Sequence, residues 1–240
     1  LAGELRGAHR IAVDVAPLDL SDSAARGELL DRLRSRPIAG LVNSAGFGTH
    51  GPFQSLPADR ERDQVIVNVL ALTELTHAAL PSMIARGEGY LLSTASAAGL
   101  LTQIGSLAYS VTKGAAVSLA EFLSITHHHQ GIRVSVLCPQ AVATNIVANS
   151  PDLGGAGATP DDFEGGVASG DGVLSSAEVA QACLDAMRDE RFHVLPHPEV
   201  ATYVERKATD VDRWLTGMRR FQSALAAGGP LPGDAMAPKL

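Results

Sequence analysis

Short apolar runs that alternate with longer amphipathic segments constrain the fold of this chain more than any other feature. The runs with the length and composition of buried strands are residues 11–15, 38–42, 87–92, 132–137 and 192–195. Segments with apolar residues at helical spacing are 24–36, 59–80, 109–129 and 175–187. Local signals predict helix ends at Gly7 and at a left-handed Gly131, an N-terminal cap at Asp59, and a capping box of Ser175 and Glu178. This alternation predicts an α/β fold with a doubly wound, mostly parallel sheet in three layers, α/β/α, in a single domain.

The composition excludes several classes of partner. A net charge of -7 and a pI near 5.6 argue against a nucleic-acid surface or an anionic membrane, because both need clustered lysine and arginine. Cys138 and Cys183 are far apart in the sequence, which fits a reducing compartment better than a disulfide framework. We find no apolar run of membrane-spanning length and no secretory signal. We therefore expect a soluble, cytoplasmic protein whose ligands are small molecules.

Small and polar residues follow three of the predicted strands. Residues 43–46, Asn-Ser-Ala-Gly, come directly after the run at 38–42, Ser96 follows the run at 87–92, and Pro139 follows the run at 132–137. Doubly wound sheets bind their ligands at the carboxyl ends of the strands. The sequence therefore predicts a ligand site at this edge of the sheet.

Tyr109 and Lys113 are four residues apart in a predicted helix, so their side chains lie on the same face. A neighbouring ammonium lowers the pKa of a phenol from about 10 toward neutrality, which makes the phenol a usable acid or base. The hydroxyl of Ser96, held beside the phenol, would hydrogen-bond a substrate oxygen and stabilise charge on it. By itself the pair also fits a packed ring beside a solvated amine.

Ser96 followed thirteen residues later by Tyr109-x-x-x-Lys113 resembles the active-site pattern of the short-chain dehydrogenase/reductase family. The resemblance covers residues 1–195 and implies a Rossmann-like fold that binds NAD or NADP. It places Asp19 and Leu20 beside the adenine. Further matches are the adenosine-side residues Asn43, Ala45 and Gly46, the helix asparagine Asn68, and the nicotinamide-side residues Pro139, Val142 and Thr144. Ser44 and Gln140 depart from the family pattern.

The resemblance also implies a reaction, the transfer of a hydride between the nicotinamide and a small to medium, mainly apolar alcohol or ketone. Tyr109 would act as the general acid or base, Ser96 would hold the substrate oxygen, and Lys113 would bind the nicotinamide ribose. Asn68 would hold a water that resupplies protons. Because the family associates through the helices that carry Asn68 and Tyr109, we expect a homodimer or homotetramer.

The glycine-rich turn that opens the family's first helix is absent from this sequence. We expect that the first strands and the first helix are missing and that the chain is part of a longer polypeptide. The predicted divisions are a Rossmann-like domain at 1–198 with a mobile substrate loop at 149–174, a C-terminal helical extension at 199–227 and a disordered tail at 228–240. Phe47, His50 and Phe53 are predicted to shape the pocket together with that loop.

Other interpretations stay open. Ser96 and Asp19 also fit capping roles, and Asn68 also fits a backbone hydrogen bond. The whole chain also fits a non-catalytic nucleotide-binding or regulatory protein with this fold, or less well an epimerase of the related extended family. We predict no metal site, because the consecutive residues His127–His129 point in different directions on a helix and do not converge on one ion.

Overall fold

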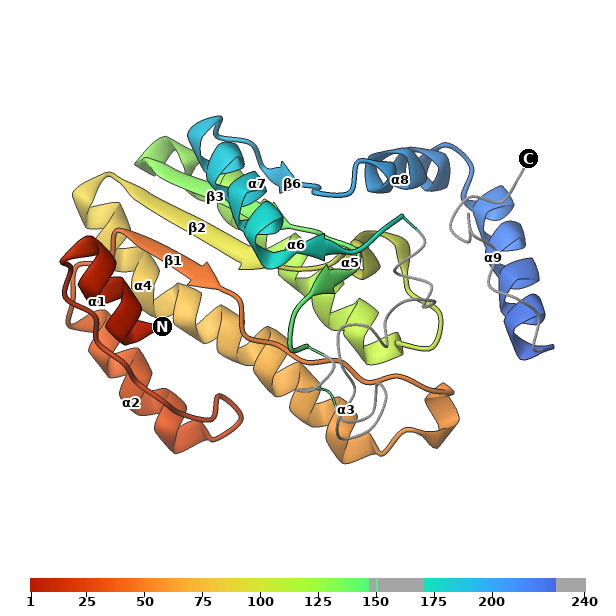
Figure 1. The fold of residues 1–240 in the computed structure, drawn as a ribbon, viewed down its shortest axis with the longest axis horizontal. Helices are drawn as coiled ribbons and strands as arrows, with labels where there is room; N and C mark the ends of the chain where they lie inside the picture. The colour runs from red at the N-terminus through yellow and green to blue at the C-terminus, as the bar shows by residue number, and fades with distance from the viewer. Residues whose placement is uncertain (147–149, 151–170, 228–240) are drawn as a thin grey trace.

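A parallel sheet forms the centre of the computed structural model, which describes residues 1–146, 150 and 171–227. Its strands are β1 (Gly40–Asn43), β2 (Gly89–Thr94), β3 (Ile132–Leu137) and β6 (His193–Val194), hydrogen-bonded in the order β1-β2-β3-β6 (Figure 1). The predicted parallel α/β sheet is confirmed. Most of the predicted loop at 149–174 and the tail at 228–240 lie outside the described residues.

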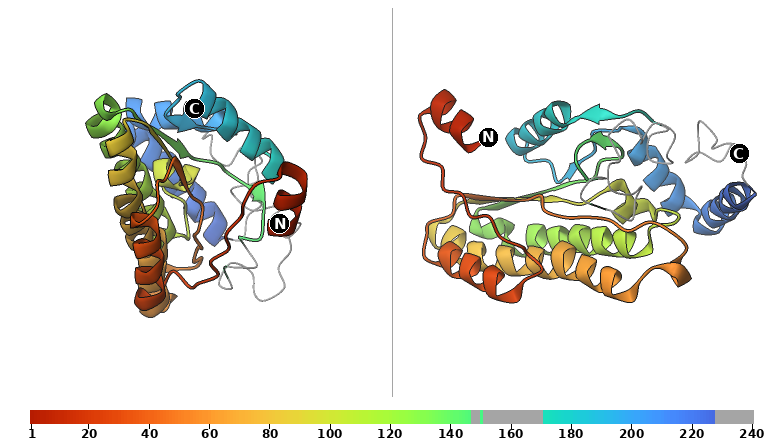
Figure 2. Two further views of the ribbon diagram at one scale, coloured as in Figure 1. Left: turned by 90° about the vertical axis from the view of Figure 1, so that its left-hand side faces the viewer. Right: turned by 60° about the horizontal axis from the view of Figure 1, so that its bottom comes forward.

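Helices cover both faces of the sheet, as predicted (Figure 2). On one face lie α2 (Ser23–Arg34), α4 (Leu72–Arg86) and α6 (Leu107–His127), and on the other lies α7 (Ser176–Arg188). The larger apolar core is between the sheet and α4 and α6, where Met83, Leu91 and Ile132 are buried. A smaller core joins the opposite face to α7 through Leu137 and Cys183. Burial on both faces explains why β2 and β3 read as continuous apolar runs, whereas Val42 of β1 is exposed.

One uninterrupted helical segment crosses the first of these faces. It consists of α3 (Ala58–Val65), the π-helical turn η2 (Ile66–Ala71) and α4. The predicted N-terminal cap Asp59 is wrong, because Pro57 occupies the cap position and the Asp59 carboxylate accepts a hydrogen bond from the next backbone N–H. The π turn contains Asn68, and such turns occur frequently at functional sites.

This segment also corrects the expectation that no part of the chain is long and apolar enough to span a membrane. By length and composition, the 29-residue helix Ala58–Arg86 is long and apolar enough to cross a bilayer. A helix that packs on the core of a globular protein passes the same test, and here Gln64, Asn68 and Met83 are buried against the rest of the chain. Length and composition alone therefore do not assign this helix to a membrane.

The first residues depart from the prediction. Helix α1 (Ala2–His9) ends at Arg10 in the left-handed conformation and not at Gly7, and the predicted strand at 11–15 is irregular. Ile11 and Val15 are 51% and 62% exposed. A strand needs a neighbour for its backbone N–H and C=O groups, and within the described residues β1 pairs with β2 alone. An apolar run without such a neighbour does not become a strand.

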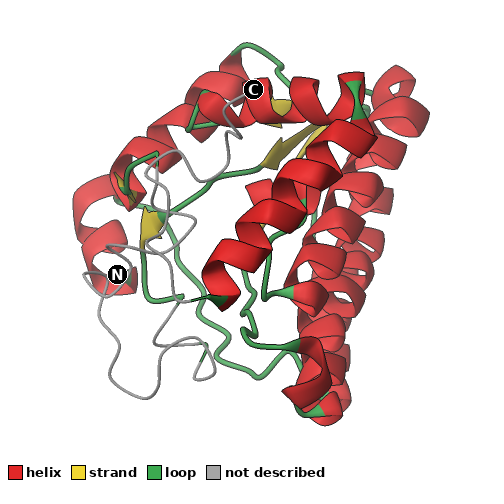
Figure 3. Ribbon diagram, turned by 90° about the vertical axis from the view of Figure 1, so that its right-hand side faces the viewer, coloured by secondary structure: helices red, strands yellow, loops and turns green. Residues whose placement is uncertain are grey.

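The C-terminal residues form a small helical unit beyond the carboxyl ends of the strands. Helices α8 (Glu199–Thr209) and α9 (Val211–Ala226) lie at that end of the molecule (Figures 1 and 3). They share an apolar cluster with α5 (Ala97–Leu101), in which Leu101 and Trp214 are buried. The remaining short elements are η1 (Phe53–Ser55), η3 (His128–Gln130), β4 (Val142–Ala143) and β5 (Leu174–Ser175). The predicted capping box of Ser175 and Glu178 opens α7.

Helix α5 crosses α6 very closely at Gly99. A Cβ atom built on Gly99 would lie 2.6 Å from the carbonyl carbon and the carbonyl oxygen of Lys113. Only a glycine permits this approach, because both neighbouring atoms belong to the backbone. The crossing therefore sets the distance between the end of β2 and the helix that carries Tyr109 and Lys113.

Gly99→Ala tests this crossing. We expect the added methyl to lower the free energy of unfolding by about 1–3 kcal/mol, the usual cost of overpacking, as measured by urea denaturation. Gly27→Ala in α2 is the matched control, because nothing lies within 4 Å of its Cβ position. That control should be neutral or more stable by up to about 1 kcal/mol. Equal stabilities of the two variants would contradict the close approach.

Candidate active site

The parallel register brings the polar strand ends to one edge. Asn43 at the end of β1 pairs with Ser93, and Thr94 at the end of β2 pairs with Leu137. The Asn43 amide donates to the Thr76 hydroxyl of α4 at 3.2 Å, which ties the end of β1 to the helical layer. The predicted location of polar residues at the carboxyl edge of the sheet is therefore confirmed.

Lys113 is the buried cation of this edge. Its side chain is 5% exposed, and its Nζ donates to the Thr94 carbonyl oxygen at 2.8 Å. The same nitrogen lies 5.5 Å from the centre of the Tyr109 ring. Helix α6 therefore brings the predicted Tyr109 and Lys113 pair together and fixes it to the end of β2.

Asn68 lies next to this pair, and its amide is hydrogen-bonded within the protein. Its Nδ2 donates to the Phe47 carbonyl oxygen at 2.9 Å and to the Thr112 hydroxyl at 3.1 Å. Its Oδ1 accepts from the Phe47 backbone N–H at 3.2 Å. The backbone alternative considered for Asn68 is thus present, and the proton-relay role stays a prediction.

Ser96 occupies the N-cap of α5. Its Oγ accepts from the backbone N–H of Ala98 at 3.1 Å and donates to the Pro139 carbonyl oxygen at 3.4 Å. The Ser96 side chain also lies near enough to Tyr109 to lower the pKa of the phenol. Ser96 therefore caps α5 and lies in the same cavity wall as Tyr109.

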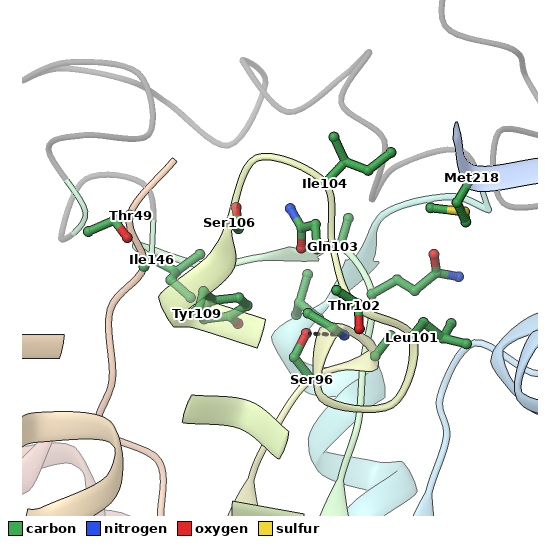
Figure 4. A pocket seen from close by; sticks show the side chains of 16 residues that line it. Thr49, Ser96, Leu101, Thr102, Gln103, Ile104, Ser106, Tyr109, Ile146 and Met218 are labelled. Atoms are coloured by element: carbon green, nitrogen blue, oxygen red, sulfur yellow. Dashed lines mark hydrogen bonds between the residues drawn. The ribbon is translucent and has the colours of Figure 1, made fainter. Parts of the chain in front are cut away.

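Tyr109 and Lys113 line two different cavities. The first, which we call the Tyr109 cavity, has a volume of about 120 Å³ and includes Ser96 and Tyr109 in its wall (Figure 4). The second, the Lys113 cavity, has a volume of about 270 Å³ and includes Asn68 and Lys113. The phenol thus faces one cavity and the amine the other. Apolar and polar side chains both contribute to the Tyr109 cavity, among them Thr49, Leu101, Gln103, Ile104, Gln140 and Met218.

Several of the residues predicted to contact a nucleotide line the Lys113 cavity. Its described lining includes Leu20, Asn43 and Ala45. Gly46 is adjacent, because a Cβ atom there would lie 3.1 Å from the Asn68 Oδ1 and 3.4 Å from the Lys113 Nζ. The backbone at Gly46 therefore passes close to the amide and the amine, and a side chain at this position would crowd both groups.

The other predicted cofactor residues are placed differently. Asp19 is exposed and accepts hydrogen bonds from the Ser21 backbone and hydroxyl, which lower the pKa of its carboxyl. Val142 lines the Tyr109 cavity. Pro139 and Thr144 are not among the described lining residues of either cavity. For these four residues, cofactor contact stays a prediction.

Burial has the largest effect on the pKa values of Tyr109 and Lys113. Desolvation raises the pKa of Tyr109, and the neighbouring Ser96 side chain offsets part of that effect. Burial also lowers the pKa of Lys113 to about 8. The pKa of the phenol is therefore raised and not lowered as expected, because the loss of water dominates and the Lys113 ammonium is not among the groups that shift it.

The predicted pocket residues Phe47, His50 and Phe53 are not among the described lining of the Tyr109 cavity. The His50 ring hydrogen-bonds the Ser106 hydroxyl at 3.1 Å, and Phe53 is exposed. Sequence reasoning instead missed Thr49 and Met218. A helix at the far end of the chain carries Met218, and no local pattern connects it with the site.

No group of three or more histidine, cysteine, aspartate or glutamate side chains within the described ranges is arranged to hold a metal ion. His127 ends α6, and His128 and His129 belong to the following 3-10 turn. Both cysteines are buried free thiols.

Comparison with known proteins identifies the class that this fold and site define. The family model described as short chain dehydrogenase matches residues 1–152. The oxidoreductase UcpA of Escherichia coli is 34% identical over 148 residues, which are 60% of this chain and 56% of UcpA. The 1-deoxy-11-beta-hydroxypentalenate dehydrogenase of Streptomyces exfoliatus is 30% identical over 213 residues, 87% of this chain and 72% of that protein.

Solved structures agree with the sequence matches. A short-chain dehydrogenase/reductase of Burkholderia phymatum in complex with NAD has a TM-score of 0.74 and 26% identity, over 88% of this chain and 80% of that one. A short-chain dehydrogenase of Sphingobium yanoikuyae in complex with NADPH has a TM-score of 0.73 and 25% identity, over 88% of this chain and 78% of that one. The chain belongs to the short-chain dehydrogenase family, and it spans about half the length of UcpA.

The depressed pKa of Lys113 predicts a pH-dependent stability. Between the folded pKa of about 8 and the ordinary value of 10.5, the unfolded chain binds more protons than the folded one. The contribution of Lys113 to the free energy of unfolding therefore rises with pH across this range. Lys113→Met removes the buried charge, so the variant should be more stable than the wild type at neutral pH, by up to about 3 kcal/mol.

Urea denaturation of both proteins at several pH values measures this difference. The advantage of the variant should shrink as the pH rises from about 8 to 10.5. Other groups titrate alike in the two proteins and cancel in the comparison. A difference that does not change with pH would contradict the burial of a charged amine.

Proposed function

We propose that this protein is an NAD- or NADP-dependent oxidoreductase that interconverts a small to medium alcohol and its ketone. The observation that carries the proposal is the arrangement of one phenol and one hydroxyl, Tyr109 and Ser96, in the wall of the Tyr109 cavity, with Lys113 in the wall of the adjacent cavity. When bound, the nicotinamide supplies or accepts the hydride.

Side chains of the protein then transfer the proton and bind the substrate oxygen. Tyr109 donates its hydroxyl proton to the carbonyl oxygen during reduction and accepts it during oxidation. Ser96 donates a hydrogen bond to the same oxygen and stabilises the charge that develops there. Lys113, fixed by the Thr94 carbonyl, presents an ammonium to the side on which ribose hydroxyls would bind.

The Lys113 cavity is the proposed cofactor site. Leu20, Asn43 and Ala45 of its lining would hold the nucleotide beside Lys113, and the backbone of Gly46 lies close to the same amine. The relatives in complex with NAD and with NADPH support a nicotinamide nucleotide. The volume of the Tyr109 cavity, about 120 Å³, favours a compact substrate.

Tyr109→Phe tests the role of the phenol. Because the variant keeps the ring but lacks the proton, turnover should fall by about 10²- to 10⁴-fold, while NADH or NADPH binding, followed by fluorescence titration, should be nearly unchanged. Tyr90→Phe is the matched control, because the Tyr90 hydroxyl bonds Ser135 away from both cavities. Equal activity of the two variants would refute the assignment of Tyr109.

A non-catalytic nucleotide-binding protein is the second candidate. It is favoured by one relative, the inactive 2-(S)-hydroxypropyl-CoM dehydrogenase 2 of Xanthobacter autotrophicus, which is 36% identical over 108 residues. The fluorescence titration with NADH or NADPH, together with the turnover measurement, distinguishes the oxidoreductase from the non-catalytic protein. Nucleotide binding without turnover of any alcohol or ketone by the wild type would support the second.

We also propose that the protein works in the cytoplasm as a homodimer or homotetramer. Apolar side chains form a stripe on the solvent side of α6, which includes Val111, Phe122 and Ile125, the last two 60% and 79% exposed. Val65 and Leu70 are exposed on the neighbouring helical segment. Such a stripe is typical of a surface that a second subunit covers.

Phe122→Glu tests the association. A carboxylate in a buried apolar interface is unfavourable, so the variant should elute as a monomer in size-exclusion chromatography with light scattering, whereas the wild type should not. Leu184→Glu on α7, which replaces another exposed apolar residue, is the control and should leave the mass unchanged. A wild-type monomer would contradict the proposal.

A further inference from the structure

The C-terminal helical unit contributes to the wall of the Tyr109 cavity. Met218 of α9 belongs to its lining together with Leu101 and Ile104. In Figure 4 these three side chains lie on the side of the cavity away from Tyr109. The cavity therefore has the hydroxyls of Ser96 and Tyr109 at one end and three apolar side chains at the other, and Thr102 and Gln103, between Leu101 and Ile104 in the chain, also line it.

The buried face of α9 holds Met218 in this position. Trp214 and Phe221, at helical spacing before and after Met218, are 4% and 7% exposed. Trp214 and Met218 both pack in the apolar cluster that α5, α8 and α9 share. Val211, the first residue of the helix, and Leu215 are 51% and 40% exposed. Met218 is therefore directed toward α5 and the cavity by two buried neighbours.

Hydrogen bonds fix the preceding helix to the same site. The Lys207 ammonium donates to the Leu100 carbonyl oxygen at 2.6 Å. The Tyr203 hydroxyl donates to the Asp171 carboxylate at 3.0 Å, and the Gln140 amide in the cavity wall donates to that carboxylate at 2.6 Å. Burial, with the Asp171 carboxylate nearby, raises the pKa of Tyr203 to about 12, so this phenol stays a donor. The end wall thus has contacts with three separate parts of the chain.

We propose that Met218 is a specificity-determining residue, which ends the substrate pocket and limits the length of the apolar group that a ketone or alcohol carries. This inference rests on the proposed function, because the reacting oxygen must lie at Ser96 and Tyr109. A cavity of about 150 Å³ holds a benzene molecule, and the Tyr109 cavity is about 120 Å³. The group that reaches Met218 is therefore no larger than about one ring or a short alkyl chain.

A series of 2-alkanones from 2-butanone to 2-decanone tests the proposal. Wild type, Met218→Ala, Met218→Phe and the control Leu215→Ala are compared by kcat/KM for each ketone with NADH and NADPH. Met218→Ala removes the thioether arm and should move the preferred ketone to a longer chain, with a gain of roughly tenfold or more in the ratio of long to short substrates. Met218→Phe should move it the other way, and Leu215→Ala should keep the wild-type profile.

A second measurement does not depend on turnover. Dissociation constants of the same ketones are determined by calorimetry with oxidised NAD or NADP present, which allows binding but no reduction. The chain-length preference should change between the variants in the same directions. Circular dichroism verifies that each variant is folded.

The outcomes of these measurements distinguish a failure of the oxidoreductase proposal from a failure of the proposed role of Met218. If no ketone is reduced but Met218→Ala changes the binding preference, the oxidoreductase proposal fails and the role of Met218 stands. If ketones are reduced and both Met218 variants keep the wild-type profile within twofold, the role of Met218 is overturned. Failure of every ketone to bind overturns it as well.

Discussion

The buried ammonium of Lys113 is the constraint on which the rest of the site depends. A cation inside a protein is unfavourable unless polar groups surround it, and here the Thr94 carbonyl oxygen accepts its hydrogen bond at the end of β2. That contact fixes α6 against the sheet, and the glycine at position 99 permits the close crossing with α5. Because the amine cannot move independently of this framework, the phenol one turn earlier is held in one place.

The position of Lys113 and Tyr109 on α6 explains why each of the two cavities contains one of these side chains. The two side chains share a helix face but line different cavities. Lys113 lines its cavity together with Leu20 and Asn43. Tyr109 lines the other cavity together with Ser96 and Met218. Parallel strands deliver their polar ends to one edge, so each cavity has residues from several distant segments. Helix α9 contributes Met218 to one cavity from beyond the sheet. Under the proposed function, changes in this helix would alter the substrate while Ser96 and Tyr109 stay unchanged.

Local patterns were reliable where the physical cause was local. The capping box of Ser175 and Glu178 and the left-handed glycine at position 131 depend on neighbouring backbone groups, and both are present. The strand expected at 11–15 failed because a strand needs a partner, which no local pattern provides. The expected cap Asp59 failed because Pro57 already begins the helix.

The sequence by itself determined the parallel α/β sheet, the family and the association of Ser96, Tyr109 and Lys113, because apolar periodicity and motif spacing are properties of neighbouring residues. The tertiary structure alone decided which groups lose contact with water. Burial makes the pKa of Tyr109 higher and that of Lys113 lower, which charge pairing within four residues did not predict. It also decided that Met218, more than one hundred residues after Tyr109, lines the same cavity, because packing brings together segments whose separation along the chain carries no signal.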